Sequence, residues 1–307
     1  MIYLIFLQMM KAKSIIKSMR LRTLPLSLSG IVLGILLASD TFSIEPLKVV
    51  FLVLTTILLQ ILSNISNELG DAINGVDTKK RKGAHYSIMD GDMTVDQMRG
   101  LILIVVLACC VSGVLMIWQC LGNLMRPVSL LFVALGACAI AAAMRYTLGR
   151  KPYGYRGLGD IFVFIFFGLV TVCGAYYLLT ESIPEASILL PASSIGCLSV
   201  AVLNVNNIRD MKTDAGKRRT TALRLGEKGA RIYQTCLIAA AWILMAVFFI
   251  LSKAKPAAAI FVLTMPFFVF HLRGVWTKKG KELDPMLPLL VTGTFFFALL
   301  SGIAVTL

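Results

Sequence analysis

The sequence has few charged residues for its length. Asp, Glu, Lys and Arg make up 15% of the 307 residues, whereas hydrophobic residues make up 58%. In a typical soluble domain about a quarter of the residues are charged. The mean hydropathy of +0.83 agrees with this shortage of charge and excludes an ordinary soluble domain. The composition therefore indicates an integral membrane protein.

Cysteine and histidine patterns that are typical of metal sites are also missing. The seven cysteines have no C-x-x-C spacing and lie within or at the ends of apolar runs, as small apolar fillers do. The two histidines, His85 and His271, are too few and too far apart in the sequence for a metal cage. We assign neither histidine a catalytic role.

Apolar runs of roughly 17 to 22 residues recur along the chain, and a helix of that length crosses about 30 Å of hydrocarbon. Strands of a β-barrel would instead alternate weakly. Nine runs occur, at residues 24–40, 47–66, 100–118, 128–144, 160–180, 186–206, 232–252, 256–272 and 286–306. The sequence therefore predicts an all-α integral membrane protein, a bundle of nine transmembrane helices in one domain over residues 1–307. Residues 1–22 are predicted to be an interfacial lead-in, because their basic residues follow the apolar stretch instead of preceding it as in a signal peptide.

The basic residues are distributed unevenly between the connections. The N-terminus and every second connection hold 26 of the 30 Lys and Arg residues, and the other side holds only Lys48, Arg126, Lys253 and Lys255. By the positive-inside rule the N-terminus is cytoplasmic and the C-terminus is outside. This topology explains most of the net charge of +14, so the charge does not indicate nucleic acid as a partner. Anionic lipids and anionic substrates would gather on the same face.

A polar cluster, "NISNELGDAINGVD", ends the second apolar run. Helical spacing places Asn64, Asn67 and Asp71 on one face, and Gly70 lets another backbone come close. Asp77 follows a turn and is expected to fold back toward Asp71. This run should therefore continue as a helix that carries a polar stripe.

A second polar cluster, "NVNNIRDMKTDAGKRRT", follows the sixth run. Its Asn206, Asp210 and Asp214 again share one helical face. Both clusters fall on the predicted cytoplasmic side and can face each other across one cavity. One polar helix end at a membrane surface would be ordinary capping, but two carboxylate pairs followed by basic residues favour a function, since buried charges in membranes are costly.

Two carboxylate pairs with basic neighbours suit one kind of chemistry. Mg²⁺ takes oxygen ligands, usually one or two carboxylates together with waters and substrate phosphate oxygens. Lys and Arg would neutralise the remaining phosphate charge. The sequence therefore predicts a magnesium-dependent diphosphate site. Because the site opens into a bundle in lipid, the group attached to the diphosphate should be hydrophobic.

The Asn67, Asp71 and Asp77 constellation and the Asp210-x-x-x-Asp214 motif resemble the two aspartate-rich motifs of the UbiA-type intramembrane aromatic prenyltransferases. The resemblance covers nearly the whole chain. Three stretches, "RTLPLSLSGIVLG", "YTLGRKPYGYRGLGDIFVFIFFG" and "LNVNNIRDMKTDAGKRRTTALRLG", are similar to the branch that prenylates 1,4-dihydroxy-2-naphthoate.

The sequence departs from the family pattern at two positions. Glu68 stands where members of the family usually have an Asp after the Asn, so we expect metal binding to persist with altered geometry. Tyr86 stands near the position of a common Arg in the loop after the first motif. Which basic residue faces the substrate there is left open.

The resemblance implies that Mg²⁺ assists ionisation of a polyprenyl diphosphate, and that 1,4-dihydroxy-2-naphthoate attacks the allylic cation with loss of CO₂. The implied catalytic residues are Asp71, Asp77, Asp210, Asp214 and Tyr146, and the four aspartates with Asn67 are the implied metal ligands. The implied substrate-binding residues are Asn67, Asn207, Arg22, Arg150, Lys151, Arg209, Lys217, Arg218 and Asp160. Tyr146 would stabilise the cation through its ring face.

Other interpretations stay open from the sequence. A sister enzyme would prenylate 4-hydroxybenzoate, and a cation-coupled transporter would use the acidic pairs to bind its ion. The aromatic stretches "FVFIFFG" and "TGTFFFALLSG" could line an opening for the prenyl tail, although packing is the commoner role of such residues. The lipid bilayer is the expected surrounding, and no protein partner is implied.

Overall fold

The computed structural model describes residues 11–76 and 87–307, which are helical and contain no strand. Within these ranges nine helices are long and apolar enough to cross a membrane, which confirms the predicted architecture. In chain order the helical segments are α2 (Ala12–Met19), α3 (Leu24–Ser39), α4 (Pro46–Ile73), α5 (Val95–Leu121), α6 (Pro127–Arg145), α7 (Gly159–Val163), a π-helical segment (Phe164–Val170), α8 (Thr171–Thr180), α9 (Leu189–Asp214), α10 (Thr221–Leu251), a 3-10 segment (Pro256–Thr264), α11 (Met265–Thr277) and α12 (Met286–Thr306).

Two helices continue well past their apolar runs. α4 extends to Ile73 and α9 to Asp214, so each carries its predicted polar cluster as a regular helical face. α10 also begins before its apolar run, where the Thr220 hydroxyl accepts a hydrogen bond from the Leu223 N–H at 3.3 Å. Such caps satisfy a backbone donor that has no partner within the helix.

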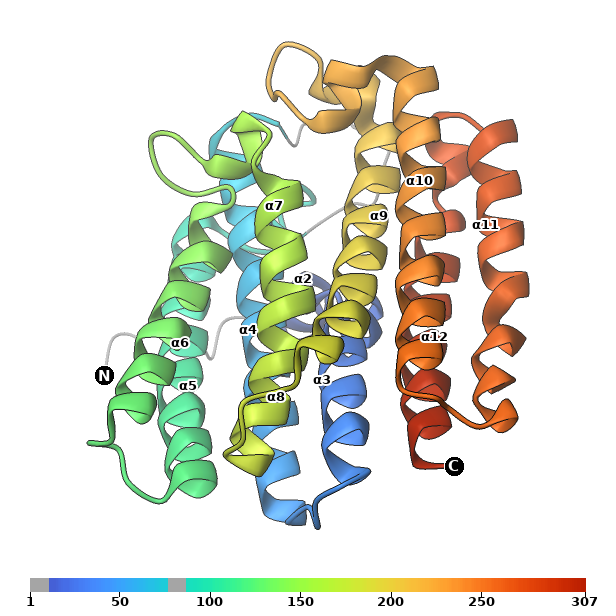
Figure 1. Cartoon of the computed structure of the whole chain (residues 1–307). Coiled ribbons are helices and arrows are strands. Elements are labelled where there is room, and N and C mark those ends of the chain that lie inside the picture. The colour runs from blue at the N-terminus through green and yellow to red at the C-terminus, as the bar shows by residue number, and fades with distance from the viewer. Residues whose placement is uncertain (1–10, 77–86) are drawn as a thin grey trace.

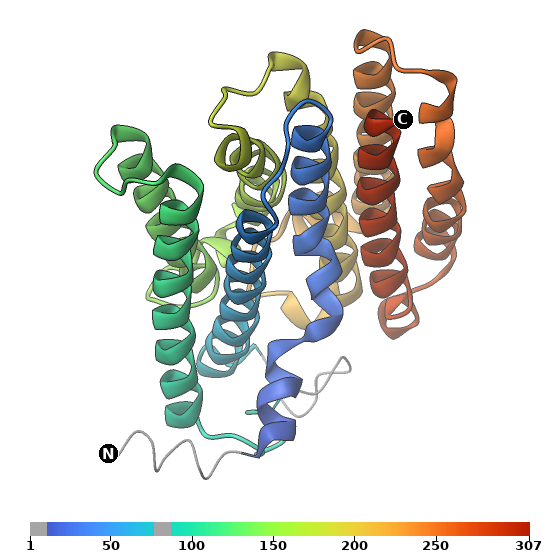
Figure 2. The same cartoon turned by 90° about the horizontal axis from the view of Figure 1, so that it is seen from below.

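Three groups of helices can be followed in Figures 1 and 2. α5 and α6 lie at one side, α10, α11 and α12 lie at the other, and α3, α4, α8 and α9 lie between them. α9 packs on α10, α3 packs on α12 and α8, and α4 packs on α5 and α6. The C-terminal ends of α4, α6 and α9 reach the same end of the bundle (Figure 1). This arrangement brings both polar clusters to one end.

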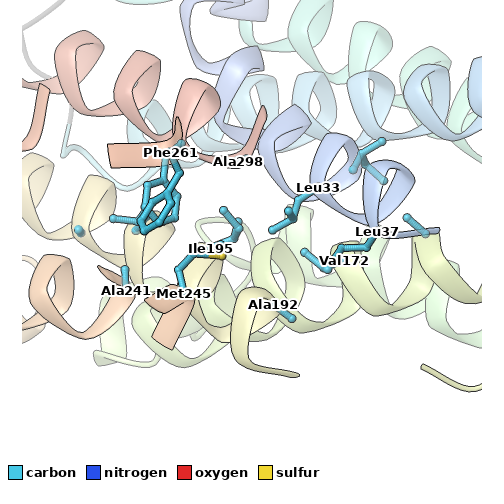
Figure 3. Packing of buried hydrophobic residues seen from close by; sticks show 14 of the residues in the cluster. Leu33, Leu37, Val172, Ala192, Ile195, Ala241, Met245, Phe261 and Ala298 are labelled. Carbon is cyan, nitrogen blue, oxygen red and sulfur yellow. The ribbon is translucent and has the colours of Figure 1, made fainter. Parts of the chain in front are cut away.

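Small residues let the central helices approach closely. A Cβ on Gly34 of α3 would lie 2.7 Å from the Val172 carbonyl oxygen, and one on Gly168 would lie 2.6 Å from the Ala192 carbonyl oxygen. Backbone contact of this kind is how helices associate where lipid removes the usual hydrophobic driving force. Around these contacts, Leu33, Ile195 and their apolar neighbours fill the centre of the bundle (Figure 3).

Candidate active site

A cavity of about 350 Å³ lies between the central helices, with polar residues at one end and apolar residues at the other. Asn67 and Asp71 reach it from α4, and Asn206, Asn207 and Arg209 reach it from α9. The predicted meeting of the two polar clusters at one cavity is therefore observed. The apolar part is lined by aromatic and aliphatic side chains of the α7 region, including Phe162, Val163, Phe166, Phe167 and Val170.

Arg218 joins the two aspartate motifs. Its guanidinium donates to Asp71 of the first motif, and its Nη1 lies 3.9 Å from Asp214 Oδ2 of the second. The Tyr155 hydroxyl donates to Asp71 Oδ1 at 2.7 Å, and the Arg218 guanidinium lies 4.6 Å from the centre of the Tyr155 ring. One cation and one tyrosine thus hold a carboxylate whose side chain is 9% exposed. Such cation–π and charge-assisted contacts are strong where water is excluded.

Arg209 gives the second motif a similar partner. It donates through Nε and Nη2 to both carboxylate oxygens of Asp210, at 2.9 and 2.6 Å. Its Nη1 donates to Asp284 Oδ1 at 3.0 Å, and its Nη2 also donates to Asn206. The bidentate contact fixes the orientation of the Asp210 carboxylate beside the cavity.

The end of α4 is anchored to the segment after α6. The Thr147 hydroxyl donates to the Ser66 carbonyl oxygen at 3.0 Å and contacts Asn67 Oδ1 at 3.3 Å, and Asn74 donates to the Thr147 carbonyl oxygen at 3.0 Å. A Cβ on Gly70 would lie 2.8 Å from the Thr147 carbonyl carbon. The prediction that Gly70 admits another backbone is confirmed.

Tyr146 lines the cavity, and two glycines pack closely against it. The Gly154 N–H donates to the Tyr146 carbonyl oxygen at 3.0 Å, and a Cβ on Gly154 would lie 2.6 Å from that oxygen. A Cβ on Gly159 would lie 3.2 Å from the Tyr146 ring. A side chain at Gly154 or Gly159 would clash with or crowd Tyr146, which explains these two glycines of "PYGYRGLGD". Burial raises the pKa of Tyr146 to about 12, so its hydroxyl stays protonated at neutral pH.

Aromatic rings continue from Tyr146 into the apolar end of the cavity. The Tyr153 ring meets that of Tyr146 edge-on at 5.4 Å between centroids and stacks on Phe162 at 4.1 Å, and Phe162 stacks with Phe166 at 6.3 Å. The π-helical segment begins at Phe164, and such wider turns are frequent at functional sites. The stretch "FVFIFFG" therefore does line the cavity.

The aromatic stretch of α12 has the packing role instead. Phe297 is fully buried and packs against Trp242, Phe261 and Phe268, with ring centroids 5.3 to 5.8 Å apart. From α12 the cavity is lined only by Leu287, Pro288 and Val291. These aromatic side chains thus stabilise the bundle at a distance from the cavity wall.

Of the remaining predicted substrate-binding residues, some lie at the cavity and others do not. Arg22 lines the cavity, and Lys217 donates to the Gly75 carbonyl oxygen at 2.8 Å beside the first motif. Arg150 and Lys151 are exposed and do not line the cavity. Asp160 accepts a hydrogen bond from the Tyr233 hydroxyl at 3.1 Å and lies outside the cavity lining.

Three residues singled out from the sequence remain: Glu68 and Tyr86, which depart from the family pattern, and the predicted metal ligand Asp77. Glu68 is 1% exposed and outside the cavity lining, where its Oε1 accepts from the Ile88 N–H at 3.0 Å. Asp77 and Tyr86 lie outside the described residues. A contribution of Asp77 to the metal site therefore stays a prediction.

Sequence reasoning missed two polar residues of this region and one contact. Gln60 and Arg20 line the cavity, and the Tyr155 hydroxyl bonds Asp71. The helical spacing of Gln60 and Asn67, seven residues apart, would have placed Gln60 on the polar face of α4. Arg20 and Tyr155 carry no comparable signal, because they come from connections whose path the sequence pattern does not define.

The oxygen donors suit a hard divalent cation. Among the described residues no group of three or more His, Cys, Asp or Glu side chains is close enough to hold a metal. Asp71, Asn67 and Asn207 nevertheless supply carboxylate and amide oxygens to the same cavity, and Asp210 and Asp214 lie beside it on α9. Arg218 and Arg209 form ion pairs with Asp71 and Asp210. Oxygen ligands of this kind are those that Mg²⁺ prefers.

Comparison with known proteins agrees with this site. The model of the UbiA prenyltransferase family matches residues 27–303. The chain is 36% identical over 280 residues to the 1,4-dihydroxy-2-naphthoate octaprenyltransferase of Escherichia coli, covering 91% of this chain and 89% of that protein. It is 39% identical over 293 residues to the Haemophilus influenzae protein of the same name, covering 92% and 94%.

Solved structures share the fold at low sequence identity. A UbiA homolog from Aeropyrum pernix superposes with a TM-score of 0.67 at 15% identity, covering 92% of this chain and 95% of that one. A UbiA homolog from Archaeoglobus fulgidus, bound to DMAPP and Mg²⁺, superposes with a TM-score of 0.63 at 15% identity, covering 95% and 99%. The helical architecture, the two polar clusters at one cavity and the match over most of the chain lead to one conclusion: this multi-pass membrane protein belongs to the UbiA prenyltransferase family.

Proposed function

We propose that this protein transfers a polyprenyl group from polyprenyl diphosphate to 1,4-dihydroxy-2-naphthoate and thereby makes a demethylmenaquinol. The observation that carries the proposal is one cavity in which Asp71 of the first motif and Asn206, Asn207 and Arg209, beside the second motif, meet an apolar, aromatic extension. The polar end suits a diphosphate and the apolar end suits a prenyl chain. The relatives that bear this activity in their names match about nine tenths of the chain.

The diphosphate would lie at the polar end. Asp71, Asp210 and Asp214, together with Asn67 and Asn207, would hold Mg²⁺, and Asp77 is proposed as a further ligand. When bound, Mg²⁺ supplies Lewis acidity to the leaving diphosphate. Arg209, Lys217 and Arg218 then neutralise the negative charge that develops as the C–O bond breaks.

The naphthoate would lie toward α3 and α4. Gln60 is 8% exposed, and its Oε1 has no hydrogen-bond partner among the described residues. Its amide nitrogen is already engaged with Thr23 and Asn64, so Oε1 is the group left to accept from a naphthol hydroxyl. Arg22, in the same cavity, offers a cation for the carboxylate.

The reaction balances without a further reagent. The allylic C–O bond breaks and the diphosphate leaves with its electron pair. The ring carbon that bears the carboxylate forms the new C–C bond, and the carboxylate leaves as CO₂, which returns electrons to the ring. Tyr146 and Phe162 line the cavity, where their rings would stabilise the allylic cation.

We further infer that the site opens to the cytoplasm of a bacterial cell, because the basic connections carry most of the Lys and Arg residues. Ile183 is 86% exposed at one end of the bundle, and Lys212 is exposed near the site. In a cysteine-free background, Ile183→Cys should react with an impermeant thiol reagent added outside, and Lys212→Cys should not. The opposite labelling pattern would overturn this orientation.

The function is tested with purified protein, a polyprenyl diphosphate and 1,4-dihydroxy-2-naphthoate, with and without Mg²⁺. Prenylated product and CO₂ should appear in equal amounts and only with Mg²⁺. 4-Hydroxybenzoate, assayed in parallel, should not be prenylated. Product from 4-hydroxybenzoate alone would reject the assignment of acceptor, and no product from either acceptor would reject the transferase.

A further inference from the structure

A second, open pocket adjoins the reaction cavity at its polar end. It has a volume of about 690 Å³ and is lined by seven residues, five of them basic: Tyr155, Arg156, Gly216, Lys217, Arg218, Arg219 and Arg224. Arg218 lines both this pocket and the reaction cavity. A side chain that is 10% exposed therefore forms the wall between the diphosphate end of the cavity and a basic surface pocket.

Most of the basic residues of this pocket have no acidic partner in the part of the chain that the structure describes. Some basic side chains elsewhere on the surface are paired, as in the ion pairs Lys17–Asp90 and Arg126–Glu181. Within the described residues no carboxylate pairs with Arg156, Lys217, Arg219 or Arg224, and no acidic residue lines the pocket. Several cations that converge without a counter-charge make a favourable place for an anion.

The pocket is held together by two segments that are far apart in the sequence. The Arg219 N–H donates to the Tyr155 carbonyl oxygen at 3.0 Å, and Arg224 Nη2 donates to the Arg156 carbonyl oxygen at 3.1 Å. Gly157 has φ +81°, and a Cβ there would lie 2.6 Å from the Arg219 carbonyl oxygen. The walls are therefore built by defined backbone contacts, and the side chains of Arg156 and Arg219 are left to face a ligand.

We propose that this basic pocket is a second diphosphate subsite, which receives the leaving group on its way to water. The inference rests on the proposed function, because that reaction releases diphosphate. The prenylated product can leave into lipid, but a multiply charged anion cannot cross hydrocarbon. Transfer needs only that the Arg218 guanidinium exchange Asp71 and Asp214 for diphosphate oxygens, which offer the same kind of charge-assisted contact.

The test measures diphosphate binding while the reaction site is filled. Purified protein in detergent is saturated with Mg²⁺ and geranyl thiolodiphosphate, which does not ionise readily, and binding of radiolabelled inorganic diphosphate is then titrated. The wild type should bind one further diphosphate. Arg156→Gln/Arg219→Gln should weaken this binding about tenfold or more, since it removes two cations at the ligand.

Two controls keep the result specific. Lys212→Gln removes one charge from the same surface outside the pocket and should bind like the wild type. Arg156→Lys/Arg219→Lys keeps the charge and should retain most of the binding, which separates loss of the ligand contact from loss of folding. No second-site binding in the wild type, or equal binding in the double Gln variant, overturns the proposal.

A lipid phosphate is the other source of the same chemistry. The titration is repeated in nanodiscs of phosphatidylglycerol and of phosphatidylcholine. Equal diphosphate binding in both supports the leaving-group subsite, and suppression by phosphatidylglycerol assigns the pocket to a lipid headgroup and overturns it. The binding assay contains no acceptor, so its result is independent of the prenylation assay. If product forms but no second diphosphate binds, only this inference is rejected. If no product forms, the proposed function is rejected.

Discussion

Replacement of Arg218 by Gln should raise the affinity of the site for a divalent cation when no diphosphate is bound. In the wild type, the Arg218 guanidinium lies against two buried carboxylates, Asp71 and Asp214, which are predicted metal ligands. A divalent cation at these carboxylates would be repelled by the guanidinium unless an anion such as diphosphate lay between them. Arg218→Gln removes this repulsion.

The expected magnitude follows from the spacing. Arg218 Nη1 lies 3.9 Å from Asp214 Oδ2, so a cation at these carboxylates would be a close neighbour of the guanidinium. Two unit charges about 4 Å apart interact by about 4 kcal/mol at an effective dielectric constant of about 20. Loss of only about 1.4 kcal/mol of this repulsion would tighten binding about tenfold. We therefore expect at least a tenfold gain in affinity for the metal alone.

The assay follows free Mn²⁺ by electron paramagnetic resonance, with and without geranyl thiolodiphosphate. In the wild type the analogue should tighten Mn²⁺ binding strongly, and reciprocity requires the same factor for the effect of Mn²⁺ on the analogue. Arg218→Gln should show tighter binding without the analogue and a smaller coupling factor.

A neighbouring cation provides the matched control. Lys217 is exposed and donates to a backbone carbonyl instead of a carboxylate, so Lys217→Gln should change Mn²⁺ affinity less than about threefold. Unchanged Mn²⁺ affinity in Arg218→Gln, or equal gains in both variants, would refute the reasoning from repulsion between Arg218 and the metal.

Four further outcomes are expected. Asp210→Asn should abolish product formation in the prenylation assay while membrane insertion and the melting temperature persist; full turnover would contradict the metal assignment. Gly34→Val places a side chain against the Val172 carbonyl oxygen and should cost about 1–3 kcal/mol, measured as a lower melting temperature in detergent. Phe166→Ala should raise KM for the prenyl diphosphate roughly tenfold, whereas Phe270→Ala, a change at a 60% exposed ring, should not alter KM. Because burial raises the pKa of Tyr146 to about 12, its hydroxyl stays neutral, so the wild type and Tyr146→Phe should have pH–rate profiles of the same shape between pH 7 and 9.

Much of the architecture could be predicted from the sequence because membrane insertion imposes a strong local rule. Every backbone polar group in hydrocarbon must be paired within the helix, and each crossing needs about 20 apolar residues, so the runs alone predict the helices. The polar faces of α4 and α9 were predictable for a related reason. Asn67 and Asp71, or Asp210 and Asp214, are one helical turn apart, and their side chains must share a face wherever the helix lies.

Contacts between segments that are distant in the sequence depended on the tertiary structure. Nothing in the pattern around Tyr155 indicates that its hydroxyl bonds Asp71, because the connection after α6 is neither apolar nor periodic. The same holds for Arg218, which was predicted to serve the diphosphate but also joins both motifs and separates two cavities. The local sequence determined which faces are polar. Only the packing of α4 against the segment after α6, and of the loop after α9 across both, decided which cation meets which carboxylate.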